Sequence, residues 1–149
     1  MELIEVIDKK ATIQNVRNFF AEDFNHYLNL ANKHLSDISS PTLDGSGISK
    51  SVENAREEKY VVNLDAVNCV RAVNDTINSC SYRNAQIIYM YYIKHMQDII
   101  IIDRLRYQTS RYYQMKNEAL FEFAERMDYW RDRDNASIKS LLAFRKVEL

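Results

Sequence analysis

Glycine and proline are scarce in this chain, which has two glycines and one proline in 149 residues. Because these residues punctuate hairpins and tight loops, their scarcity favours long uninterrupted elements. All three fall in one serine-rich stretch, SDISSPTLDGSGISKS (36–51), which predicts a loop or linker. We therefore expect an all-α protein whose N-terminal part is separated from a larger helical body by this segment.

Long apolar runs are also missing. The longest aliphatic run, Ile99 to Ile102, is far shorter than the roughly 18 residues that a membrane span needs. The first ten residues, MELIEVIDKK, begin with acidic side chains instead of the basic region of a signal peptide. We expect a cytoplasmic protein with no membrane partner.

Patterns typical of disulfides, metal sites and catalysis are absent as well. Cys69 and Cys80 are eleven positions apart in one predicted helix, about 16 Å along its axis, so they should remain free thiols. The three histidines form no metal-binding motif. No nucleophile stands beside a base, and there is no phosphate loop. We expect a protein that is not an enzyme and has no cofactor.

Apolar residues recur at helical spacing in several segments. Residues 11–33 predict one long amphipathic helix, and residues 52–80 a second, which either continues or breaks near residues 63–65. Ser81 is placed to cap a third helix. The resulting domain prediction is an N-terminal arm (1–35), a linker (36–51) and a helical body (52–149). The arm either packs on its own body or exchanges with a second copy, and the tail from 128 to 149 predicts a short further helix.

Two helices in close succession are predicted between residues 97 and 126. Asp98 is placed to begin the first, and Thr109 or Ser110 to cap the second. Four consecutive isoleucines also suit a buried strand, but helix is favoured because no comparable second strand is available to pair with it. The inward face of the second helix is defined by apolar residues at helical spacing: Tyr112, Met115, Ala119 and Phe123.

The outward face of that second helix begins with short polar side chains and an arginine. A helix, a short turn and a second helix with such residues on its first turns are what a DNA-reading helix-turn-helix requires, because base edges are read by these side chain types. An αα-hairpin inside a helical bundle would show the same pattern. The residues alone leave both interpretations open.

Charge is distributed unevenly along the chain. The net charge is −1, which argues against a nucleic-acid partner, yet residues 81–116 carry six basic and two acidic side chains. Because the local surface sets the field that a ligand meets, a basic face on a neutral protein is compatible with phosphate binding. An ordinary solvated helix face is the alternative.

The same region resembles the ArpU/RinA-type family of phage transcriptional regulators, whose C-terminal part is similar to region four of the sigma factors. The context is IIDRLRYQTSRYYQMKNEALFEFAE, and the resemblance extends upstream to SPTLDGSGIS and NVRNFF. In such sequences a glycine is common at the position that Arg106 holds here, so either the turn differs or some strain is tolerated. The matching residues are Ile101, Leu105, Tyr107, Ser110, Tyr112, Tyr113, Lys116, Ala119, Leu120, Phe123 and Ala124.

The resemblance implies a sequence-specific activator of phage late genes, for packaging, morphogenesis or lysis, with double-stranded DNA, RNA polymerase and a second copy of the chain as expected partners. A helical adaptor that binds RNA polymerase or a phage protein without reading DNA is the rival. Its aromatic patch would consist of Tyr89, Tyr91, Tyr92 and Tyr107, although a core role is favoured for these side chains. The residues expected at base edges are Gln108, Ser110, Arg111, Gln114 and Asn117. Thr109, at the helix start, is also expected in the DNA-binding surface. Those expected at phosphates are Arg83, Arg104, Arg106, Tyr113 and Lys116.

Overall fold

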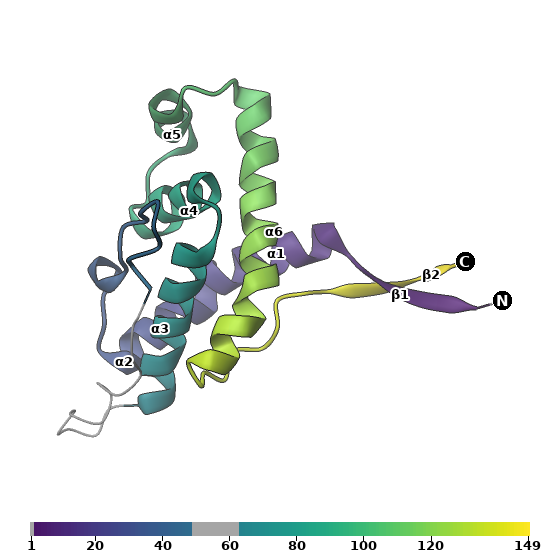
Figure 1. Cartoon of the computed structure of the whole chain (residues 1–149), viewed down its shortest axis with the longest axis horizontal. Helices are drawn as coiled ribbons and strands as arrows, with labels where there is room; N and C mark the ends of the chain where they lie inside the picture. The colour runs from purple at the N-terminus through teal and green to yellow at the C-terminus, as the bar shows by residue number, and fades with distance from the viewer. Residues whose placement is uncertain (1, 49–62) are drawn as a thin grey trace.

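The computed structural model describes residues 2–48 and 63–149, and the described chain is mostly helical, as the composition predicts. Figure 1 shows the helices gathered around one long helix, α6, with a narrow two-stranded ribbon projecting from the body. The elements in chain order are β1 (Leu3–Ile7), α1 (Lys9–Asn18), η1 (Phe19–Asp23), α2 (Phe24–Ala31), η2 (Leu35–Asp37), α3 (Leu64–Ser79), α4 (Tyr82–Ile88), η4 (Tyr89–Ile93), α5 (Asp98–Leu105), α6 (Thr109–Arg133) and β2 (Phe144–Glu148).

The N-terminal helix follows its sequence pattern closely. Asp8 caps it by accepting a 3.1 Å hydrogen bond from the Ala11 N–H, and the helical path runs through α1, the π-helical turn η1 and α2. Asn32, in the left-handed conformation, ends it. The apolar stripe packs back on its own chain, because α1 contacts α6 and α2 contacts α3. In this structure the arm thus shares one hydrophobic core with the body.

Helix α6 organises that core and confirms the predicted inward stripe. Tyr112, Met115, Ala119 and Phe123 are each at most 1% exposed. The centroid of the Phe123 ring lies 5.0 Å from the centroid of the Phe20 ring on η1. Because α1, α3 and α4 all pack against α6, the orientation of α6 is set from several sides.

Helix α3 begins where the sequence left a break open. Asn63 caps it, accepting a 3.0 Å hydrogen bond from the Ala66 N–H, while residues 52–62 of the predicted helix lie outside the described residues. The helical spacing of Leu64 predicts a core-facing position, but its side chain is 52% exposed because it occupies the first position of the helix. Cys69 and Cys80 are free and buried, as predicted. Burial raises the pKa of Cys69 to about 11 and that of Cys80 further.

Residues 36–48 of the predicted linker lie on α3. Ile38 is buried, the Ser39 N–H donates to Asn74 Oδ1 at 2.8 Å, and Asn74 Nδ2 donates to the Gly47 carbonyl at 2.9 Å. A Cβ at Gly47 would lie 2.4 Å from Asn78 Oδ1, which explains the glycine at this close approach. This part of the segment is therefore a docked loop.

The prediction of a further helix in the tail is wrong. Helix α6 continues to Arg133, and the chain then runs in extended form to β2, which pairs antiparallel with β1 in the register Leu3↔Glu148 to Ile7↔Phe144. The tail does dock on the body, since the Ala143 N–H donates to Thr12 Oγ1 at 2.9 Å. The pairing escaped prediction because each strand is short and its partner lies at the other end of the chain.

Asp134 follows α6 in a buried position beside Asp75 of α3. Burial raises the pKa of Asp134 to about 8, and the hydrogen bond and negative charge of Asp75 act in the same direction. Arg133 lies 3.7 Å from Asp75 and 4.0 Å from Asp134 and opposes this shift. The end of α6 therefore holds a buried carboxyl group, that of Asp134, whose protonated form is favoured.

Over residues 2–48 and 63–149, no helix combines the length and the apolar character that crossing a membrane would take.

Candidate nucleic-acid interface

The junction of α5 and α6 places the predicted reading residues. Helix α5 ends at Leu105 and α6 begins at Thr109, with Gln108 at the N-cap position. The predicted caps, Thr109 and Ser110, are therefore one and two residues too late, because the extended conformation already ends at Gln108. The side chain of Gln108 makes no capping hydrogen bond.

Arg106 decides between the two alternatives that the sequence left for the turn. It has φ 59° and ψ 43°, the left-handed conformation, and its N–H donates to the Ile102 carbonyl at 2.8 Å. A residue with a Cβ costs about 1 to 2 kcal/mol in this conformation. The turn thus keeps the geometry that suits glycine and tolerates the strain of an arginine.

The structure exposes most of the predicted contact residues, on the end of α5, the turn and the first turns of α6. The opposite face of the first turns of α6 is buried in the core through Tyr112 and Met115. Arg83 comes from α4 and is half-buried. The exposed members are Arg104, Arg106, Gln108, Thr109, Ser110, Arg111, Tyr113, Gln114 and Asn117.

Lys116 is the exception, and the prediction that it holds a phosphate is wrong. It is 7% exposed, and its Nζ lies 2.9 Å from Asp98 Oδ1 and 3.3 Å from the centroid of the Tyr91 ring. The Tyr112 hydroxyl donates to the same Asp98 oxygen at 2.6 Å. Because its long stem follows the flank of the apolar stripe, the lysine reaches the first turn of α5 and ties the two helices together.

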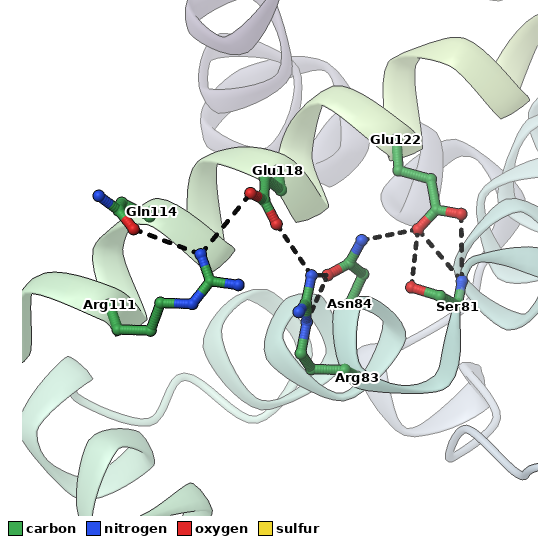
Figure 2. Close-up of polar contacts among 7 residues, drawn as sticks. All are labelled: Ser81, Arg83, Asn84, Arg111, Gln114, Glu118 and Glu122. Atoms are coloured by element: carbon green, nitrogen blue, oxygen red, sulfur yellow. Dashed lines mark hydrogen bonds and ion pairs between the residues drawn. The ribbon is translucent and has the colours of Figure 1, made fainter. Parts of the chain in front are cut away.

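Glu118 lies between Arg83 of α4 and Arg111 of α6 (Figure 2). Its carboxylate is 2.9 Å from Arg83 Nη2 and 3.9 Å from Arg111 Nη1, and Arg111 also donates to Gln114 Oε1 at 3.3 Å. One carboxylate is thus shared by two guanidinium groups. The cluster keeps one net positive charge, but both arginines are held by the protein itself.

Glu122, one turn further along α6, fixes α4 in place (Figure 2). It accepts hydrogen bonds from the Ser81 N–H and hydroxyl and from Asn84 Nδ2, at 2.8 to 3.1 Å. Burial acts to raise its pKa, but the hydrogen bonds from Arg126, Asn84 and Ser81 lower it below the ordinary value. Ser81 thus occupies the N-cap position of α4, as predicted, but its hydroxyl bonds to Glu122 of α6 and makes no capping hydrogen bond to its own helix.

A row of polar residues on α1 borders the same region, and the sequence analysis missed it. Arg17 Nη2 donates to Asn117 Oδ1 at 3.1 Å, so α1 contacts the reading helix directly. Lys10, Gln14 and Arg17 are exposed and spaced four and three residues apart, which places them on one face of the helix. This spacing was visible in the sequence, but packing of the arm on its own body and exchange with a second copy were both open, so nothing placed these residues beside residues 108–117.

Among the described residues, no group of three or more His, Cys, Asp or Glu side chains could hold a metal ion. No protein-family model matches the chain, and no curated protein or solved structure matches it either.

Proposed function

We propose that this chain is a sequence-specific double-stranded DNA-binding transcriptional regulator in which α5, the turn at 106–108 and α6 act as a helix-turn-helix. The observation that carries the proposal is the two-sidedness of the first turns of α6. Ser110, Arg111 and Gln114 are exposed, while Tyr112 and Met115 on the other side are buried. A rigidly held helix with a polar, arginine-containing face is suited to reading base edges.

The placement of α6 favours insertion into a groove. In Figure 1 its first turns extend past the level of α4 and α1, with α5 beside them. A helix with side chains is about 10–12 Å across, which matches the roughly 12 Å width of the major groove. Insertion of these turns would bring the turn and the end of α5 towards the phosphate backbone.

Within this proposal the side chains divide by role. Ser110, Arg111 and Gln114 contact base edges, and Arg111 is best suited to a guanine because its fork can bond to two acceptors. Arg104 and Arg106 hold phosphates, because they are exposed at the end of α5 and in the turn. The remaining base-edge candidates are Gln108, Thr109 and Asn117, and the remaining backbone candidates are Arg83 and Tyr113.

The resemblance to ArpU/RinA-type regulators supports a more specific proposal, an activator of phage late genes that acts in the cytoplasm of a bacterial host. An activator needs a second surface for RNA polymerase. On α5, Ile99 is 69% and Ile100 49% exposed, and two adjacent exposed isoleucines suit a protein contact. These side chains also favour the second candidate function, an adaptor that binds RNA polymerase without reading DNA.

The proposal is tested by selecting bound sites from a random duplex library and titrating the parent and Arg111→Ala with the selected duplex and a scrambled one. The parent should enrich a defined site. Arg111→Ala should lose about 1 to 3 kcal/mol on that site and little on the scrambled duplex. Arg145→Ala, which removes an exposed arginine from β2, is the matched control and should bind both duplexes as the parent does.

Equal binding of the selected duplex by Arg111→Ala and the parent would remove Arg111 from the reading face. A parent with no salt-dependent affinity for any duplex would overturn DNA binding itself. The adaptor function would then be supported by retention of RNA polymerase on the parent and its loss on an Ile99→Ser/Ile100→Ser variant.

A further inference from the structure

A groove of about 940 Å³ runs between α1 and α6, next to the turns proposed to read DNA. Gln114 and Asn117 line its α6 side, and Lys10, Gln14 and Arg17 line its α1 side. The groove is thus continuous with the proposed DNA surface, because Gln114 and Asn117 belong to both. Its volume is within the range of sites that hold a ligand group of moderate size.

The basic side chains on the α1 side of this groove have no carboxylate partner, unlike the basic side chains on and beside α6. Lys116 is paired with Asp98, and Arg83 and Arg111 share Glu118. In the part of the chain that the structure describes, Lys10 and Arg17 form no ion pair. A side-chain cation without an internal partner can neutralise a DNA phosphate and release the counterion condensed on the DNA there.

The acidic residues that line the groove have other partners. Asp8 caps α1 by accepting from the Ala11 N–H, and Glu118 is engaged by Arg83 and Arg111. Neither carboxylate forms an ion pair with Lys10 or Arg17 among the described residues. The α1 wall therefore offers positive charge that the protein does not neutralise.

Arg17 belongs to the α1 side of the groove and contacts its α6 side. Its Nη2 donates to Asn117 Oδ1 at 3.1 Å, which orients the guanidinium towards α6. A guanidinium carries five N–H donors, so one hydrogen bond to an amide leaves donors for an anion. Lys10, seven residues earlier on the same face, extends the positive row by about 10 Å along the helix.

We propose that Lys10 and Arg17 bind the sugar-phosphate backbone of the same duplex whose bases α6 reads, which makes α1 part of the DNA interface. This inference rests on the proposed function. In Figure 1 the start of α1 extends to one side of α6 and α5 lies on the other. Phosphates border the major groove on both sides, so Arg104 and Arg106 at the end of α5 and in the turn would contact one strand and α1 the other.

The test is a salt titration of duplex binding with the full chain and a Lys10→Gln/Arg17→Gln variant. The slope of log K against log salt is negative, and its magnitude should be smaller by about 1.8 in the variant, because each phosphate contact contributes about 0.9. The loss should be the same on the selected and scrambled duplexes. Both side chains are exposed, so the melting temperature should stay close to that of the parent.

Two further variants make the test specific. Lys33→Gln/Lys139→Gln removes the same charge away from the groove and should leave the slope unchanged. Gln14→Lys adds a cation on the groove face of α1 and should increase the magnitude of the slope by about 0.9. If the parent binds duplex DNA but the Lys10/Arg17 and Gln14 variants keep its slope, α1 is not a backbone contact and the proposed function stands. If the parent binds no duplex, both proposals are wrong.

Discussion

Lys116→Ala tests whether this lysine joins α5 to α6 or contacts DNA. The substitution removes the partner of Asp98 at 2.9 Å and the cation above the Tyr91 ring at 3.3 Å. Removing one partner of a fully buried pair costs about 3 to 5 kcal/mol. Here the Asp98 side chain is 25% exposed and keeps the Tyr112 hydroxyl, so a smaller electrostatic loss of about 2 kcal/mol is expected.

The contact with Tyr91 adds about 1 kcal/mol, which brings the total loss to about 3 kcal/mol. For a chain of this length, 1 kcal/mol corresponds to about 2 to 4 °C in melting temperature, so Lys116→Ala should melt about 6 to 12 °C lower than the parent. Lys116→Met keeps much of the apolar stem and should lose less.

A double-mutant cycle with Asp98→Asn identifies the cause. If the ion pair is responsible, Lys116→Met should cost less in the Asp98→Asn background than in the parent. The salt slope of DNA binding should be unchanged in the folded Lys116→Met variant. The reasoning would be refuted if Lys116→Ala melted within about 1 °C of the parent and lowered the slope by about one, because the lysine would then be a phosphate contact.

Glu118→Gln should strengthen binding to scrambled duplex DNA several-fold and increase the magnitude of the salt slope, because it releases Arg83, a backbone candidate, from its carboxylate partner; unchanged binding in a salt titration would show that Arg83 does not reach phosphate. Arg106→Gly should raise the free energy of unfolding by about 0.5 to 1 kcal/mol in urea melts by relieving the left-handed strain, and a loss of stability would show that the arginine side chain contributes more than the strain costs. Asp134→Asn should stabilise the protein by about 1 to 3 kcal/mol at pH 8 and much less at pH 4. Between the ordinary carboxyl pKa near 4 and the raised value of about 8, the folded chain keeps a proton that the unfolded chain releases, so the parent should lose stability as the pH rises through this window; equal effects at both pH values would contradict this sign.

Local patterns in the sequence predicted the parts of the fold that depend on helix periodicity. The stripe from Tyr112 to Phe123 is buried as predicted, because a period of 3.6 assigns every residue of a helix to a face. The same rule misplaced Lys116, since periodicity treats a side chain as a point, while a lysine on the edge of the stripe can bend to a partly buried carboxylate.

Features that depend on distant parts of the chain were beyond the sequence. The contact of Arg17 with Asn117 exists only because α1 folds back onto α6, and no local signal encodes that distance. The exposure of Ser110, Arg111 and Gln114 was predictable, whereas the compensation of Arg111 by Glu118 depends on rotamers of two long side chains. Sequence reasoning thus located the candidate surface but could not tell which of its cations are free to bind.

The pairing of β1 with β2 has a consequence for the order in which the chain acquires its structure. Leu3 and Glu148 are partners although they are separated by almost the whole length of the chain, so pairing the ribbon carries a large loop-closure cost. The helices can form from local contacts, but β1 can pair with β2 only after residues 144–148 have been synthesised. We therefore expect the ribbon to form last and, in hydrogen exchange, to open first.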